Sequence, residues 1–146
     1  MRKILAINFF GVIWCQISFA QSMISINDYM KKNTNWIKDP ISIAYVFKRC
    51  GAVYIYASAL TDVKKQIKAF EKASNSSLKF AHDVLVEEKN MSSSKATDIV
   101  FGSMDEIMLN YKNDGNKSYA ATGEYTSNNY IGKDLSTCKG LVESIN

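Results

Sequence analysis

Two cysteines that lie far apart in the sequence, Cys50 and Cys138, each belong to an apolar stripe with helical spacing. The positions around Cys50 are four, three, four and three residues apart: Ile43, Phe47, Cys50, Tyr54 and Ala57. The same spacing joins Ile131, Leu135, Cys138, Val142 and Ile145. Residues three and four apart share one face of a helix, so both thiols should point into a core. We expect a disulfide between them; the alternative is two buried free cysteines.

The start of the chain determines which cysteines remain to pair. A basic start and an apolar run precede Ser18 and Ala20, the small residues typical of a signal-peptide cleavage site. We therefore expect residues 1–20 to be a secretory signal peptide and residues 21–146 to form a single mature domain. A buried N-terminal helix and an uncleaved anchor are the alternatives.

Cleavage would change both the cysteine count and the charge. It removes Cys15 and leaves an even pair, which an oxidising compartment normally joins. It also removes Arg2 and Lys3, which leaves sixteen basic and fourteen acidic residues and a net charge of +2 instead of +4. That balance is too mild to favour nucleic-acid binding. Because Lys, Asn and Ile are abundant, we expect a bacterial protein that is periplasmic or secreted.

Apolar residues recur every three or four positions along the mature chain, and no strand-like alternation persists. The expected fold class is all-α: a bundle of four main helices plus a short N-terminal helix, with the disulfide joining the second and last helices. The short helix should begin near Asn27 or Asp28 and carry Trp36 and Ile37. The second helix should begin at Asp39–Pro40, a carboxylate cap followed by proline.

The third helix should begin with Thr61 as its cap. Its apolar stripe stays in phase across the polar residues 74–77, which favours one continuous helix over two helices joined by a turn. The fourth helix should carry the apolar stripe from Ala96 to Tyr111 and be stopped by residues 113–115.

At the end of the fourth helix, Gly115 is suited to the left-handed position that follows a helix. Residues 116–126 read equally as a loop or a helical turn. The last helix should begin near Thr126 or Ser127.

Residues 41–60 are long and apolar enough to raise the question of a membrane span. Lys48 and Arg49 would then lie near the bilayer centre, where inserting each charged side chain costs about 2.5 to 3.5 kcal/mol. A core helix requires no such penalty if the two charged side chains extend from the edge of the apolar stripe toward water. We therefore expect a core helix.

No arrangement typical of catalysis is evident. His82 is the only histidine, and Asp83, Glu87 and Glu88 are poorly spaced to join it in a metal site. The sequence lacks a nucleophile elbow and a Gly-rich phosphate loop. We expect no metal and no cofactor, and the absence of motifs favours a protein that does not catalyse a reaction.

Three features remain as candidate binding elements, although each is also compatible with a solvated face or intramolecular packing. Four lysines in the first half of the third helix are a candidate site for an anionic surface such as lipid headgroups: Lys64, Lys65, Lys68 and Lys72. Candidate partner contacts are Tyr54, Tyr56, Tyr125 and Tyr130. The last two lie in the polar segment 118–132, whose composition is typical of adaptable contact loops.

The leading hypothesis is an exported, disulfide-linked helical module that binds or scaffolds. Its candidate partners are an unidentified protein, a component of the cell envelope, weakly bound membrane surface, or further copies of itself. The alternative is an envelope-associated hydrolase or stress factor that uses carboxylates not identifiable from the sequence.

Overall fold

The computed structural model describes residues 23–145, and the expected signal peptide lies outside them. The described part is all-helical, as the periodicity predicts, and contains no strand. In chain order its elements are α1 (Ile26–Lys32), the 3-10 turn η1 (Trp36–Lys38), α2 (Pro40–Ser58), α3 (Lys64–Glu87), α4 (Ser93–Phe101), α5 (Met104–Thr122) and α6 (Tyr130–Glu143).

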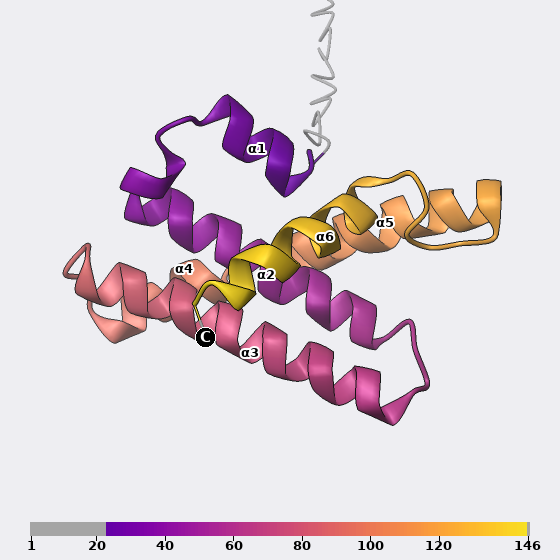
Figure 1. Cartoon of the computed structure of the whole chain (residues 1–146). Coiled ribbons are helices and arrows are strands. Elements are labelled where there is room, and N and C mark those ends of the chain that lie inside the picture. Colours follow the sequence, from indigo (N-terminus) through magenta and orange to yellow (C-terminus); the bar gives the residue numbers. More distant parts are fainter. Residues whose placement is uncertain (1–22, 146) are drawn as a thin grey trace, which may run out of the picture.

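The helices are arranged around α2 (Figure 1). α2 and α3 lie side by side and run in opposite directions, with the most extensive contact of any two elements. α6 crosses α2 and reaches α3, while α4 and α5 contact α2 from other sides. α1 packs against α6 at the N-terminal end of the described chain. α2 therefore forms the centre of the core.

The sequence of α2 explains its central position. Its cap is Asp39, whose carboxylate accepts hydrogen bonds from the backbone N–H groups of Ile41 and Ser42 at 3.3 and 3.1 Å. Between residues 44 and 57, every side chain except Tyr45 and Ile55 is buried. A helix that is apolar on nearly all sides belongs inside a core. No helix within residues 23–145 is long and apolar enough to cross a membrane.

The third helix is continuous, as its in-phase stripe predicts. The polar segment 74–77 lies in the middle of α3, and Ser74 and Ser77 are buried on its core face. The Ser77 hydroxyl donates to the carbonyl of Ala73 at 2.8 Å, which satisfies a buried polar group within the helix. The cap position of α3 is Val63, two residues after the expected cap Thr61.

The prediction of one fourth helix over residues 96–111 is wrong. α4 ends at Phe101 and α5 begins at Met104, so two helices replace one. α5 then continues through Gly115 to Thr122, and residues 116–122 are helical. The left-handed residue that follows α5 is Gly123, with φ of 79°. The sequence thus indicated the right residue type for the helix end but the wrong glycine.

Gly115 has a packing role instead. A β-carbon at this position would lie 2.1 Å from the Tyr56 hydroxyl oxygen and 3.3 Å from Cδ1 of Ile131. Glycine in a helix otherwise disfavours folding by roughly 1 kcal/mol relative to alanine. The close approach of α2 and α6 to α5 therefore explains why a glycine lies inside a helix.

We expect Gly115→Ala to lower the free energy of unfolding by about 1 to 3 kcal/mol, because overpacking outweighs the gain in helix propensity. The matched control is Gly140→Ala, which meets no atom within 4 Å and should be neutral or stabilising by up to about 1 kcal/mol. Urea denaturation of both variants measures the difference. Adding Tyr56→Phe to Gly115→Ala should restore part of the lost stability. Equal changes in the free energy of unfolding at the two glycines would contradict this account.

The remaining helix ends differ from expectation by a few residues. α1 begins at Ile26 with Ser25 as its cap, and its length stops short of Trp36, which lies in the separate turn η1. α6 begins at Tyr130, where the Asn129 side chain accepts a hydrogen bond from the backbone of Gly132 at 3.1 Å. A side chain two or three residues from the expected cap takes over capping at both helices.

Candidate functional site

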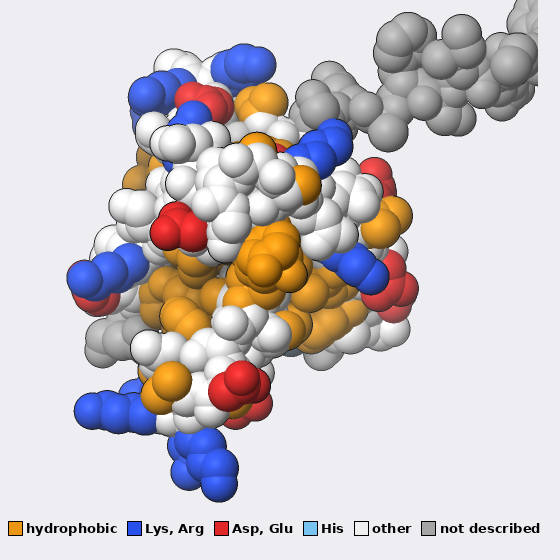
Figure 2. Space-filling view, turned by 90° about the vertical axis from the view of Figure 1, so that its right-hand side faces the viewer, with side chains coloured by type: hydrophobic (Ala, Val, Ile, Leu, Met, Phe, Trp, Pro, Cys, Tyr) orange, Lys and Arg blue, Asp and Glu red, His pale blue; other side chains and the backbone are white. Residues whose placement is uncertain are grey.

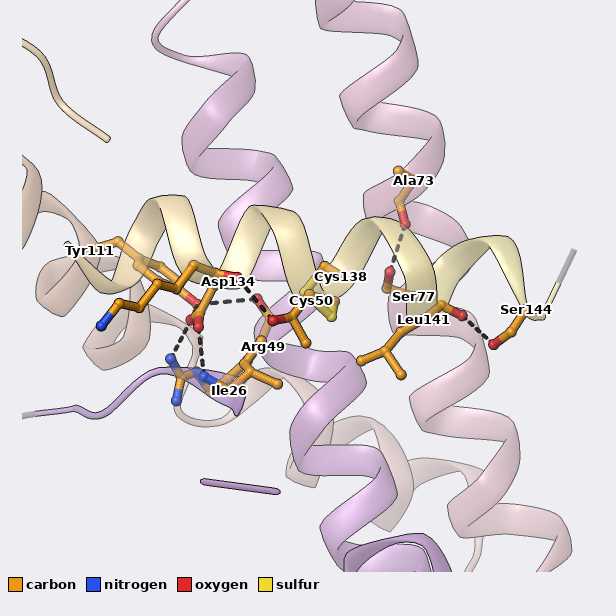
Figure 3. The surroundings of a disulfide bond; sticks show 12 residues. Ile26, Arg49, Cys50, Ala73, Ser77, Tyr111, Asp134, Cys138, Leu141 and Ser144 are labelled. Carbon is orange, nitrogen blue, oxygen red and sulfur yellow. Dashed lines mark hydrogen bonds and ion pairs between the residues drawn. A yellow bond between two sulfur atoms is a disulfide. The ribbon is translucent and has the colours of Figure 1, made fainter. Parts of the chain in front are cut away.

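The predicted disulfide between Cys50 and Cys138 is confirmed. The Cα atoms are 5.3 Å apart, and neither residue has exposed surface. The bond joins α2 to α6 where the two helices cross (Figure 3). The second main helix and the last helix are neighbours, as the two stripes predicted.

A buried charged cluster lies beside the disulfide. Arg49 of α2, Tyr111 of α5 and Asp134 of α6 converge there, and all three are fully buried (Figure 3). Asp134 forms an ion pair with Arg49 and accepts hydrogen bonds at 2.6 Å from the Tyr111 hydroxyl and from the backbone N–H of Ile26. Arg49 also donates to the carbonyl of Ile24 at 2.6 Å. The cluster thus ties the start of the described chain to three helices.

The charges in this cluster depend on one another. Burial acts to lower the pKa of Arg49, but Tyr111 and Asp134 raise it by more, so the guanidinium stays protonated. Burial raises the pKa of Asp134, while Arg49, Tyr111 and the Ile26 N–H lower it. The rings of Tyr45 and Tyr111 each lie 5.9 Å from the guanidinium carbon. Because no atom of the ion pair reaches the surface, we assign the cluster a structural role.

The expectation that Lys48 and Arg49 extend toward water is wrong. Lys48 is 7% exposed and Arg49 is fully buried. The Lys48 ammonium donates to the carbonyl of Ile99 at 3.0 Å and to the hydroxyl of Ser103 at 2.8 Å. Helices pack on α2 from several directions. The side chains beside its apolar stripe, Lys48 and Arg49, therefore contact protein instead of solvent.

Asp134 and Tyr111 were not identified from the sequence, although a signal was present. Asp134 lies one turn before Cys138 on the same helix face, and Arg49 is adjacent to Cys50. Once the two cysteines are paired, Arg49 and Asp134 must lie near each other. A charged residue at the centre of an apolar helix requires such a partner, because an unpaired buried charge is costly.

The four predicted lysines lie together on the surface. Lys64, Lys65, Lys68 and Lys72 are all exposed on the first three turns of α3. We call residues 60–72 the α2–α3 tip. In Figure 2 this tip is the lowest part of the molecule, where lysine side chains extend below a band of hydrophobic surface.

Two apolar side chains of the tip are also exposed. Leu60 is 37% and Val63 is 53% exposed in the connection between α2 and α3. The tip carries two acidic residues, Asp62 and Glu71, so its four lysines leave it with net positive charge. Exposed apolar groups and cations thus share one protruding end.

The four tyrosines named as partner contacts do not lie together. Tyr54 and Tyr56 are each 7% exposed and pack within the chain, on Phe70 and Tyr111 respectively. Their rings therefore belong to the core. Intramolecular packing, the alternative kept open above, accounts for both residues.

Tyr125, in the connection after α5, and Tyr130, the first residue of α6, are both half-buried. Tyr125 stacks on Tyr119, with ring centroids 4.5 Å apart, and Tyr119 is 51% exposed. The Tyr130 hydroxyl donates to the carbonyl of Asn110 at 2.6 Å. Of the named tyrosines, these two alone offer surface to a partner.

His82 lies in a local polar network. Its ring nitrogens lie 3.1 Å from the Ser93 hydroxyl and 3.4 Å from the Asp83 carboxylate, which also pairs with Lys79. Within residues 23–145, no three histidine, cysteine or acidic side chains are placed to hold a metal ion.

No protein-family model matches this sequence, and no curated protein or solved structure matches it either. The candidate sites therefore rest on the geometry and chemistry of the described residues.

Proposed function

We propose that the protein is a single exported, disulfide-linked helical domain, a small bundle that acts as a binding module in the periplasm or outside the cell. Its binding element is the α2–α3 tip, and its partner is an anionic membrane surface. The observation that carries the proposal is the juxtaposition of exposed Leu60 and Val63 with four exposed lysines. The signal-peptide pattern of residues 1–20 and the disulfide support export.

The chemistry of the tip suits a lipid interface. Each lysine close to an anionic surface contributes roughly 1 kcal/mol, and the attraction falls off within a Debye length. Lys64, Lys68 and Lys72 are spaced four residues apart and form a row roughly 12 Å long on α3. Leu60 and Val63 at the end of the row can enter the headgroup region, where apolar burial adds to the charge attraction.

The distribution of charge along α3 favours one orientation. Four of the five lysines of α3 lie in its first half, and the fifth, Lys79, pairs with Asp83. Asp83, Glu87 and the cap residue Glu88 lie near the other end, roughly 30 Å further along the helix on average. The second end also carries Lys79 and Lys89, which offset part of its negative charge, so an anionic surface attracts the first end more strongly than the second. The asymmetry would therefore direct the tip, and not the opposite end, toward the membrane.

The mature protein should sediment with vesicles rich in phosphatidylglycerol and not with phosphatidylcholine vesicles. Replacing Lys64, Lys65, Lys68 and Lys72 with glutamine should weaken binding by about tenfold or more. Raising the salt concentration should also release the wild-type protein.

The matched control for this quadruple variant changes net charge equally but away from the tip. It replaces four exposed lysines of α5 and α6 with glutamine: Lys112, Lys117, Lys133 and Lys139. Binding that falls equally in the two quadruple variants, or that does not depend on lipid charge, would contradict the proposal. A protein that binds neither type of vesicle would also contradict it.

A further inference from the structure

A second candidate site lies away from the tip, in a cavity of about 660 Å³ between α1, α2 and the start of α5. Small-molecule sites typically have volumes of roughly 300 to 1,000 Å³ and combine apolar walls with a few polar groups. Tyr29 and Tyr45 line the cavity, with ring centroids 4.7 Å apart, and Ile107 adds aliphatic surface. Its size and lining suit a small organic molecule.

The polar groups of the cavity carry charges of both signs. Lys32 of α1 and Glu106 of α5 line it, and both are exposed. Ser103, which precedes α5, lines it as well. The cavity therefore offers cationic and anionic partners beside an aromatic wall.

The ammonium of Lys48 lies directly behind this lining. The Lys48 ammonium lies 2.8 Å from the hydroxyl oxygen of Ser103. This oxygen and the carbonyl of Ile99 accept hydrogen bonds from two of its three N–H groups. Within residues 23–145, no carboxylate lies within ion-pair distance of it. Burial lowers the pKa of Lys48, and the more distant Glu106 only partly opposes this effect. Buried charges are normally paired, so this ammonium lacks a counter-charge that a ligand can supply.

We propose that the cavity binds a small zwitterion with an apolar or aromatic body, of the α-amino acid or short-peptide class. The ligand carboxylate accepts a hydrogen bond from the Ser103 hydroxyl, and the Lys48 ammonium behind that hydroxyl supplies the counter-charge. The ligand ammonium lies at Glu106. Its body packs against Tyr29, Tyr45 and Ile107. Lys32 adds a second cation beside the carboxylate. This site is separate from the tip and does not depend on membrane binding.

Three probes that share one aromatic body test the proposal. Phenylalanine carries both charges, 3-phenylpropionate lacks the ammonium, and 2-phenylethylamine lacks the carboxylate. Each probe is titrated into the mature protein while the NMR signals of the cavity residues are recorded. Phenylalanine should bind at least about tenfold more tightly than either analogue. Phenylalanylglycine, a longer zwitterion, distinguishes an amino-acid site from a peptide site.

Two substitutions separate the roles of the charges. Lys48→Met should weaken the binding of phenylalanine and of 3-phenylpropionate by about tenfold or more, because both ligands carry the carboxylate. Glu106→Gln should reduce the affinity for phenylalanine to the affinity for 3-phenylpropionate. The affinity for 3-phenylpropionate itself should stay unchanged or rise. Because Glu106 is exposed, its variant tests the proposal even if the Lys48 variant does not fold.

Lys112→Met and Glu143→Gln are the matched controls, since both residues are exposed and lie outside the cavity lining. They should bind phenylalanine as the wild type does. The proposal is overturned if no probe shifts signals of the cavity, if the three probes bind equally, or if Glu106→Gln leaves the preference for the zwitterion intact.

Discussion

Replacing Asp134 with alanine is expected to lower the free energy of unfolding by about 3 to 5 kcal/mol. The substitution leaves the fully buried guanidinium of Arg49 without its counter-charge. It also removes the acceptor of the Tyr111 hydroxyl and of the Ile26 N–H. Because a domain of this size is stable by only about 5 to 15 kcal/mol, the loss amounts to a large share of the total.

Urea denaturation with the disulfide intact measures this loss, and Asp98→Ala on the surface of α4 is the control. A second variant separates charge from packing. Replacing Arg49 with methionine and Asp134 with leucine together removes both charges, and it should restore most of the stability lost in Asp134→Ala. A loss no greater than that of Asp98→Ala would show that the ion pair does not hold the core.

Removing the disulfide should have the second large effect. The bond closes a loop with a sequence separation of 88 residues, for which the chain-entropy relation gives about 4 to 5 kcal/mol. Measured effects for native disulfides are typically about 2 to 5 kcal/mol. We therefore expect the variant with Cys50→Ala and Cys138→Ala to unfold at a clearly lower urea concentration than the oxidised protein.

Reducing agent provides the matched control for the disulfide. It should destabilise the wild-type protein and leave the doubly substituted variant unaffected. Thiol labelling of the unfolded, non-reduced protein without residues 1–20 is an independent check, and two reactive thiols would contradict the bond. Because Arg49 adjoins Cys50 and Asp134 lies one turn from Cys138, the effects of the two perturbations should not be additive.

Apolar periodicity correctly predicted the helical class, the burial of α2 in the core, the continuity of α3 and the disulfide. These features are local or involve one pair of stripes, so a single sequence carries enough information. The Asp39–Pro40 start of α2 is likewise a local capping signal.

The failures occurred where packing between helices overrode a local signal. Gly115 resembled a helix end, but it allows Tyr56 to approach the interior of α5. Lys48 and Arg49 lay beside an apolar stripe, and the surrounding helices determined that they are buried. The cavity beside Tyr45 joins three separate segments, so no pattern within any one of them indicates it.

By itself the sequence determined the all-helical class, the main apolar faces and the expected pairing of Cys50 with Cys138, because backbone hydrogen bonding and amphipathic spacing act over a few residues. Only the tertiary structure decided where the charges lie. Whether an ammonium or guanidinium reaches water depends on what packs against its helix, and those neighbours come from distant parts of the chain.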